Sequence, residues 1–198
     1  MIDMPCVILC GGKSSRMKED KTLLPFFNSN SLAQFQYDRL KLHFKNIYIS
    51  SKTNKFNFIN EKNLILDENK EIFSPILALD TIFKKINNRK IFIITVDSPF
   101  VTIESIKELI KNSVDVDVCV AKTEDKVHNL CGVFDSNISI TIQSMLRDDI
   151  HKINYLIKQN KFKIIEFTNH NEFMNINNPE DYKKSLSYIN KIYNSNWQ

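Results

Sequence analysis

Residues 6–25, CVILCGGKSSRMKEDKTLLP, join an apolar run to a loop that holds two glycines and several basic side chains. A short apolar run that ends at glycine predicts a buried β-strand leading directly into the loop. Gly11 and Gly12 lack a Cβ and can adopt positive φ, so backbone N–H groups can close around an anion. The cations available to neutralise that anion are Lys13, Arg16, Lys18 and Lys21. The stretch therefore predicts a polyphosphate-binding loop at the end of a strand.

This loop is not the Walker loop of P-loop nucleotide-binding proteins. Gly12-Lys13-Ser14 matches the end of that motif, but the motif requires an earlier glycine where this chain has Val7. The phosphates must therefore be bound by a different arrangement of backbone and cations.

Short apolar strands and amphipathic helices alternate along the rest of the chain. We expect strands over residues 46–50, 64–66, 91–96, 116–121, 130–134 and 163–167. We expect helices over residues 32–43 after the cap Ser31, 75–86, 103–110 after the cap Thr102, 138–146, 153–159, and from Pro179 after the cap Asn178. Residues 91–96 are apolar on both faces, which is typical of a parallel sheet covered by helices. The pattern predicts a Rossmann-like three-layer α/β/α sandwich with a mostly parallel central sheet, in one domain over residues 1–198.

The composition excludes several classes of protein. The chain is 42% hydrophobic and 25% charged, has no apolar run near the ~20 residues of a membrane span, and shows no secretory signal. Cys6, Cys10, Cys119 and Cys131 form no Cys-x-x-Cys pair, which predicts reduced core thiols in a cytoplasmic protein. The net charge of +4 comes with lysines scattered along the chain, without the interleaved aromatic residues typical of nucleic-acid binding.

Polar residues follow several of the expected strands. Because parallel strands end at one edge of a sheet, Ser50, Asp67 and Asp97 should meet the glycine loop there. Asp97 follows a buried strand and is a candidate ligand for Mg²⁺, which commonly takes one or two carboxylates plus phosphate oxygens. The two oxygens of Asp67 match the N1–H and N2–H₂ donors of guanine. Each aspartate also has a simpler interpretation, as a turn or capping residue.

The loop also carries a family resemblance. Leu9-Cys10-Gly11-Gly12-Lys13-Ser14-Ser15-Arg16-Met17 with Asp20-Lys21 resembles the signature (L/A)-A-G-G-x-S-x-R-M-G…K of a nucleotidyltransferase family, and its Asp-Lys ending most resembles the molybdenum cofactor guanylyltransferases. Three later stretches also resemble this family: Asp97-Ser98-Pro99-Phe100, His128–Phe134 around Gly132, and Asn175–Asp181. The chain departs from the family pattern at Lys18, at Ser50, at Asn129, and at Ser74 and Ala78, where the family has glycine, asparagine, proline and two glycines.

The resemblance implies a reaction and a set of residues. GMP would pass from GTP to molybdopterin-bound molybdenum cofactor, giving molybdopterin guanine dinucleotide and pyrophosphate, with Mg²⁺ as cofactor. The implied catalytic residues are Lys13, Arg16, Lys21 and Asp97, with Asp97 as metal ligand. The implied GTP-binding residues are Leu9, Cys10, Gly11, Gly12, Lys21, Ser50, Asp67 and Asp97. Asn175 and Asn177, and more weakly His128, are expected on the acceptor side, with no proton-transfer role for the histidine.

No general base is expected, because a phosphate monoester acceptor has a second pKa of about 6 and is already largely ionised at neutral pH. The expected partners are GTP and the molybdopterin cofactor, together with upstream cofactor-synthesis proteins and target molybdoenzymes. Two alternatives stay open. One is another nucleotidyltransferase of the same fold, acting in cytidylyl or sugar-nucleotide transfer. The other is a GTP-binding module without catalysis.

Overall fold

The computed structural model describes residues 1–12, 17, 19–69, 71–124 and 126–195. The described strands are β1 (Cys6–Leu9), β2 (Ile47–Ser51), β3 (Leu64–Leu66), β4 (Lys90–Thr95), β5 (Val118–Thr123), β6 (Lys126–Asp135) and β7 (Phe162–Glu166). The described α-helices are α1 (Leu32–Lys41), α2 (Pro75–Lys85), α3 (Ile103–Asn112), α4 (Ser139–Arg147), α5 (Ile153–Lys158) and α6 (Pro179–Ser195). Short 3₁₀ helices, not expected from the sequence, are η1 (Lys21–Leu23), η2 (Glu61–Asn63), η3 (Ser136–Ile138) and η4 (His170–Phe173).

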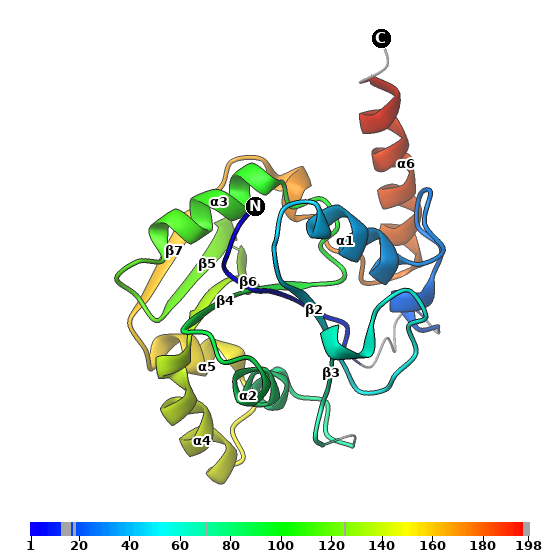
Figure 1. The fold of residues 1–198 in the computed structure, drawn as a ribbon. Coiled ribbons are helices and arrows are strands. Elements are labelled where there is room, and N and C mark those ends of the chain that lie inside the picture. The colour runs from blue at the N-terminus through cyan, green and yellow to red at the C-terminus, as the bar shows by residue number, and fades with distance from the viewer. Residues whose placement is uncertain (13–16, 18, 70, 125, 196–198) are drawn as a thin grey trace.

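The strands form one sheet in the order β3-β2-β1-β4-β6-β5-β7 (Figure 1). Strand β6 runs antiparallel to its neighbours β4 and β5, and the other neighbouring pairs are parallel. The chain moves outward from β1 to β3 and then returns to place β4 on the other side of β1. This reversal of strand order opens a crevice at the carboxyl ends of β1 and β4, where ligands of such sheets bind.

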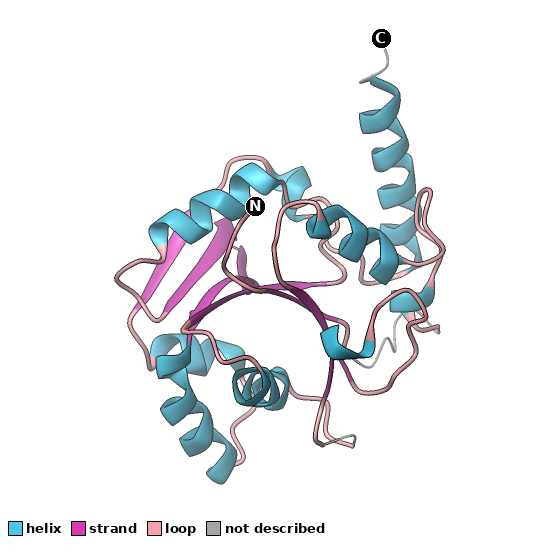
Figure 2. Ribbon diagram, in the orientation of Figure 1, coloured by secondary structure: helices cyan, strands magenta, loops and turns pink. Residues whose placement is uncertain are grey.

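Helices cover both faces of the sheet (Figure 2). One face packs against α1, α3 and α6 through a core that includes Ile8 and Phe92. The opposite face packs against α2, α4 and α5 through a core that includes Val7 and Ile93. Adjacent residues of β1 and β4 thus enter opposite cores, as expected from strands that are apolar on both sides. The predicted three-layer α/β/α sandwich with a mostly parallel sheet is confirmed.

The helix starts follow the capping signals in the sequence. The Ser31 and Thr102 side chains accept hydrogen bonds from the backbone N–H groups of Gln34 and Ser105, at the starts of α1 and α3. Asn178 Oδ1 accepts from the Asp181 N–H at 2.9 Å, at the start of α6. The expected elements are therefore present, with ends that differ by a few residues.

Strand β6 shows the largest departure from expectation, because it begins at Lys126 and the expected strand was residues 130–134. β5 ends at Thr123, so the link to β6 is too short for the crossover that a parallel pair requires, and the two strands form an antiparallel hairpin. Gly132 lies in this hairpin, where an added Cβ would be 2.0 Å from the Cys119 carbonyl oxygen. Close backbone packing, and not a ligand or an unusual φ, therefore explains this glycine.

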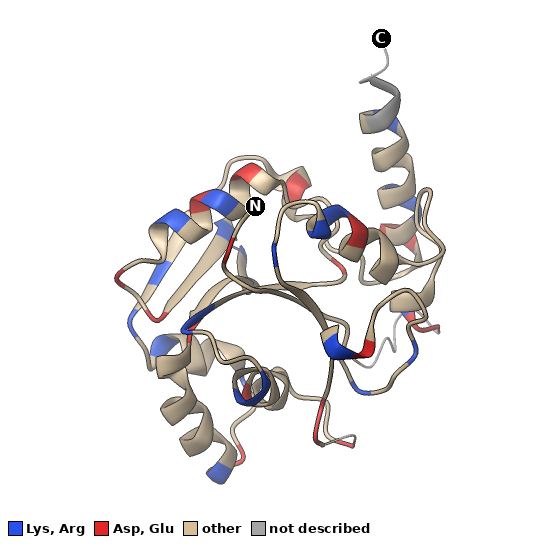
Figure 3. Cartoon of the chain, in the orientation of Figure 1, with Lys and Arg blue, Asp and Glu red and all other residues tan. Residues whose placement is uncertain are grey.

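The cysteines and the charged residues behave as the sequence predicts. All four cysteines are free and buried, and burial raises the pKa of each thiol, to about 11 for Cys119 and about 12 for Cys131. Basic and acidic residues are interspersed along the chain (Figure 3). Among the described helices, none combines the length and the apolar character needed to cross a membrane.

Candidate active site

The ends of three adjacent strands form the base of the candidate site. Leu9 at the end of β1 is in register with Ser50 of β2 and with Thr95 of β4. The Cys10 N–H donates to the Ser50 carbonyl oxygen at 2.8 Å, and the Val96 N–H donates to the Leu9 carbonyl oxygen at 3.1 Å. These hydrogen bonds continue the sheet one residue further and fix where the glycine loop leaves it. The expected strand-end positions of the first loop and Ser50 are confirmed.

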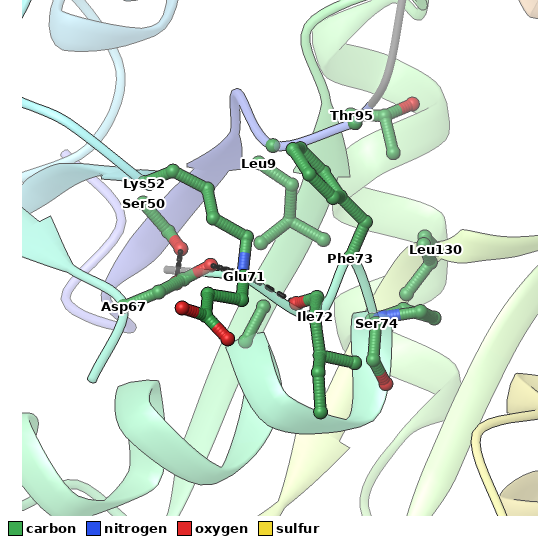
Figure 4. A pocket seen from close by; sticks show the side chains of 14 residues that line it. Leu9, Ser50, Lys52, Asp67, Glu71, Ile72, Phe73, Ser74, Thr95 and Leu130 are labelled. Carbon is green, nitrogen blue, oxygen red and sulfur yellow. Dashed lines mark hydrogen bonds and ion pairs between the residues drawn. The ribbon is translucent and has the colours of Figure 1, made fainter. Parts of the chain in front are cut away.

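A cavity of about 670 Å³ opens above these strand ends, on the side of the sheet covered by α2 (Figure 4). Leu9, Gly11 and Gly12 form one wall, and Ser50 and Asp67 lie at the end of the neighbouring strands. The opposite wall consists of residues 71–75 and Ala78, which lead into and begin α2. This volume falls in the range of small-molecule sites. Five of the residues expected to bind GTP thus line a single cavity.

Asp67 is the buried carboxylate of this cavity. Its relative exposure is 5%, its backbone N–H donates to the Ser51 carbonyl oxygen at 3.0 Å, and its Oδ1 accepts from the Ser50 hydroxyl at 3.4 Å. Its Oδ2 lies 3.6 Å from Nζ of Lys52. Burial raises the pKa of Asp67, and the Lys52 charge and the Ser50 hydrogen bond only partly oppose that effect. The site therefore holds a hydrogen-bond acceptor pair beside the Lys52 ammonium.

Lys52 is a site residue that sequence reasoning missed. It follows β2 directly and its ammonium donates to the backbone carbonyl oxygens of Asn69 and Ile72, both at 2.5 Å. Its Nζ also lies 5.1 Å from the centre of the Phe73 ring. The available sequence signal was a lysine placed immediately after a buried strand, at the same rim as Ser50. The aromatic wall residue Phe73 was missed as well, because it precedes a helix in a polar segment.

The second part of the site joins the first loop to the end of β4. Lys21 Nζ donates to Asp97 Oδ2 at 2.5 Å and to the Ile176 carbonyl oxygen at 3.2 Å. The Ile176 N–H in turn donates to the Asp97 carbonyl oxygen at 2.9 Å. The Lys21 side chain is only 16% exposed, so this ammonium is held inside the site. The motif around Asn175 is thereby joined to Asp97, although it lies far away in the sequence.

Asp20 explains why Lys21 points into the site. Asp20 caps η1, because its Oδ1 accepts from the Thr22 N–H at 3.0 Å and from the Thr22 hydroxyl at 2.7 Å. Its Oδ2 pairs with Lys55. Burial raises the pKa of Asp20, but the hydrogen bonds from Lys55 and Thr22 outweigh it and hold that pKa below its ordinary value. A charged cap thus fixes the turn that carries Lys21.

Two buried oxygens, one on Asp97 and one on the residue before Ile176, are compatible with a cation. Asp97 Oδ1 and Asn175 Oδ1 are buried and have no hydrogen-bond partner among the described residues. Such orphaned acceptors require an explanation, and a hard cation is one. In the described part of the chain no group of three or more His, Cys, Asp or Glu side chains could hold a metal. These residues therefore fit an ion that takes one carboxylate and completes its shell with phosphate oxygens and water, as Mg²⁺ does.

Three expected site residues need separate comment. The Cys10 side chain is buried in the core, so any contact of Cys10 with a nucleotide must come from its backbone. Lys13 and Arg16, expected to be catalytic, lie outside the described residues, as does Lys18. Their proposed roles stay predictions.

The acceptor-side residues lie on the same edge but in different environments. His128 is 8% exposed, its Nε2 is 2.8 Å from the Thr123 hydroxyl, and its ring centre is 4.9 Å from that of Phe173. Burial and the charge of Lys126 lower the pKa of His128 to about 4, so the ring is neutral at neutral pH. The Asn177 N–H donates to Asp181 Oδ2 at 3.0 Å, which orders the turn before α6. Contact of His128, Asn175 or Asn177 with an acceptor stays a prediction.

Comparisons with known proteins agree with this geometry. The family model of the MobA-like NTP transferase domain matches residues 6–162. A molybdenum cofactor guanylyltransferase from Campylobacter jejuni subsp. doylei is 41% identical over 189 residues, which are 94% of this chain and 97% of that relative. A Helicobacter pylori protein of the same name is 33% identical over 199 residues, which are 97% of this chain and 96% of that relative. The crystal structure of molybdopterin-guanine dinucleotide biosynthesis protein A from Archaeoglobus fulgidus shares the fold, with a TM-score of 0.80, 18% identity, and coverage of 95% of this chain and 100% of that one.

Proposed function

This chain belongs to the MobA-like NTP transferase family and is a nucleotidyltransferase, and we propose that it transfers GMP from GTP to molybdopterin-bound molybdenum cofactor. The terminal phosphate oxygen of the acceptor forms a bond to the α-phosphorus of GTP. The bond from that phosphorus to the bridging oxygen of the β-phosphate breaks, and pyrophosphate leaves with the electron pair. The products are molybdopterin guanine dinucleotide and pyrophosphate.

The observation that carries the choice of GTP is the buried Asp67 carboxylate in the cavity beside the glycine loop. Its two oxygens accept hydrogen bonds and complement the adjacent N1–H and N2–H₂ donors of guanine. Adenine presents an acceptor at N1, and cytosine presents an acceptor at N3, so both would place a lone pair against this carboxylate. A buried polar group that meets the wrong partner selects strongly against it.

The phosphates would extend from the cavity toward Lys21. A Cβ added at Gly11 would meet no atom of the described residues within 4 Å, and Gly12 has φ of 137°, so the backbone of this loop can come close to an anion. Lys21 would donate to phosphate oxygens and reduce the charge that develops on the leaving pyrophosphate. The acceptor phosphate needs no base to remove a proton, so the chain's task is to align the reactants and offset their charge.

Asp97 would hold Mg²⁺ together with phosphate oxygens, and the buried Asn175 Oδ1, on the residue before Ile176, would be available to a water of its shell. When bound, the metal would offset negative charge on the phosphates. The Lys21 ammonium, which contacts Asp97 Oδ2 in the absence of nucleotide, would donate to the phosphates when nucleotide is bound. The positive charges would thus gather where the reaction concentrates negative charge.

The test is pyrophosphate release by the purified protein with GTP, ATP, CTP or UTP, each with and without molybdenum-loaded molybdopterin. We expect release only with GTP and the acceptor together, and only when Mg²⁺ is present. Preference for CTP or for a sugar phosphate acceptor would favour the cytidylyl or sugar-nucleotide alternative. Tight GTP binding without pyrophosphate release under any condition would favour a non-catalytic module.

A further inference from the structure

Lys52 makes an unusual set of contacts for a residue at the edge of a cavity. Its side chain is 12% exposed, and its Nζ faces the carbonyl oxygens of Asn69 and Ile72 at 2.5 Å each and Asp67 Oδ2 at 3.6 Å. An ammonium has three N–H donors, and the two wall carbonyl oxygens accept hydrogen bonds from it while the Asp67 carboxylate forms an ion pair with it. The protein's own oxygens thus engage the Lys52 ammonium on both sides of the cavity, and its part in the site is to hold these groups.

Those groups lie on two different parts of the cavity (Figure 4). Asp67 is at the end of β3, and Ile72 and Phe73 are in the wall that precedes α2. The wall also has a turn of its own, because Asn69 Oδ1 accepts from the N–H groups of Glu71 and Ile72 at 3.0 and 2.9 Å. Lys52 is the cation that connects this turn to the carboxylate, with the Phe73 ring beside its Nζ at 5.1 Å.

We propose that Lys52 is a positioning residue for base specificity, which holds the Asp67 carboxylate and the Ile72–Phe73 wall in one arrangement around the bound guanine. The inference rests on the proposed function, since it assumes that Asp67 accepts hydrogen bonds from guanine. A carboxylate that can rotate or move loses the paired geometry that two adjacent donors require. A wall that moves away exposes those hydrogen bonds to water, which weakens their discrimination.

The electrostatics of the cavity support this role. Burial raises the pKa of Asp67, and Lys52 is the cation that opposes it. Without Lys52 a larger fraction of Asp67 would be protonated and would present a hydroxyl donor to guanine's donors. The other charged residues around Asp67 in the described part of the chain do not replace Lys52, since Glu68 and Glu71 are acidic and exposed, and Lys84 pairs with Glu68 and Asp80. Preference for guanine should therefore depend on Lys52.

The experiment compares GTP with ITP, which lacks the exocyclic amine of guanine. Both nucleotides are titrated calorimetrically, with Mg²⁺ and without acceptor, into wild type, Lys52→Met and the control Lys84→Met. Lys84 is a fitting control because it pairs with Glu68, next to Asp67, but does not line the cavity. A hydrogen bond to a charged group is worth about tenfold or more in affinity, so Lys52→Met should weaken GTP by about tenfold and ITP by less.

Two further variants keep the test decisive. Lys52→Arg keeps the charge and should retain most of the preference for GTP over ITP. If Lys52→Met does not fold, Lys52→Gln replaces it, since its amide can still donate to the wall carbonyls but carries no charge, and the preference should again shrink. Thermal melting of each variant shows that the protein titrated is folded.

The outcomes separate this inference from the function on which it rests. The inference is supported if Lys52→Met loses the preference for GTP over ITP while Lys84→Met keeps the wild-type preference. A wild type that binds GTP and ITP equally would overturn both base recognition by Asp67 and the role of Lys52. A wild type that prefers GTP, together with a Lys52 variant that keeps the full preference or loses both nucleotides equally, would overturn the role of Lys52 alone.

Discussion

Lys21 and Asp97 are 76 residues apart in the sequence, yet Nζ of the lysine lies 2.5 Å from Oδ2 of the aspartate. The two side chains are 16% and 13% exposed, so this is a largely buried ion pair. A buried ion is costly unless it is paired, and this contact compensates both charges before any nucleotide is present. The pair therefore links folding stability to the site proposed for catalysis.

Replacing Lys21 by methionine should lower turnover strongly and stability moderately. Loss of a group that stabilises developing charge typically costs about 10²–10³ in rate. The variant also leaves the Asp97 carboxylate without its cation, which should cost about 1–3 kcal/mol of unfolding free energy. Pyrophosphate release and urea unfolding measure the two effects. The double variant Lys21→Met/Asp97→Asn should recover much of the lost stability and none of the activity. Near wild-type turnover in Lys21→Met would refute the catalytic role of Lys21.

Replacing Asp97 by asparagine should abolish Mg²⁺-dependent activity and leave the protein folded, although stability should fall because Lys21 loses its ion-pair partner. Asparagine has nearly the same shape but supplies no negative charge to a cation that prefers anionic oxygen. The measurement is pyrophosphate release as a function of Mg²⁺ concentration. Asp80→Asn is a suitable control, since Asp80 is 9% exposed and contacts Lys84 and Gln143 away from this site. If modestly more Mg²⁺ restored activity in Asp97→Asn, another group would have to be the principal ligand.

Much of the fold could be predicted because hydrophobic patterns and helix caps determine secondary structure within a few residues of sequence. The two-faced apolar strand β4 and the caps Ser31 and Thr102 fix their elements without reference to distant parts of the chain. The direction of β6 depends on how soon the chain turns after β5, and the hydrophobic pattern alone does not report it. Among the site residues, those that end strands were predictable from their position.

The contacts of Lys52 and Lys21 could not be predicted in the same way. Lys52 reaches carbonyl groups 17 and 20 residues away, and Lys21 reaches Ile176, 155 residues away. Such contacts depend on how loops close over the strand ends. The sequence of a polar stretch does not distinguish a lysine that is held in a site from one that is exposed to solvent. Backbone carbonyl acceptors are also present at every residue, so the sequence gives no sign of which ones are used.

The glycines provide a matched test of folding against binding. An added Cβ at Gly132 would meet the Cys119 carbonyl oxygen at 2.0 Å, whereas one at Gly11 would meet none of the described residues within 4 Å. Gly132→Ala should therefore lower the free energy of unfolding by about 1–3 kcal/mol, as overpacking does. Gly11→Ala should unfold like wild type but bind GTP more weakly, because its methyl group enters the cavity. The reverse pattern in urea unfolding and GTP titration would contradict the geometry.

Preference for GTP over ITP in the wild-type protein should decrease as the pH falls. Only the ionised form of Asp67 offers two acceptors, and burial raises its pKa above the ordinary value of 3.8. The preference should therefore be complete at neutral pH and decline in the acidic range, at a higher pH than an exposed carboxylate would require. Titration of both nucleotides at several pH values, with a melting curve at each, tests this. A preference that stays constant until the protein unfolds would contradict it.

The Asp67→Asn substitution tests base recognition most directly. Asparagine keeps one acceptor and replaces the other by an amide donor, which would face a donor of guanine. GTP should lose more affinity than ITP, by about tenfold, because GTP has the exocyclic amine whose hydrogen bond is lost. Calorimetric titration of both nucleotides into wild type and variant measures the difference. Equal losses for GTP and ITP would mean that Asp67 binds the ribose or supports the loop, and guanine selection would then fall to the backbone of residues 9–12 and to Ser50.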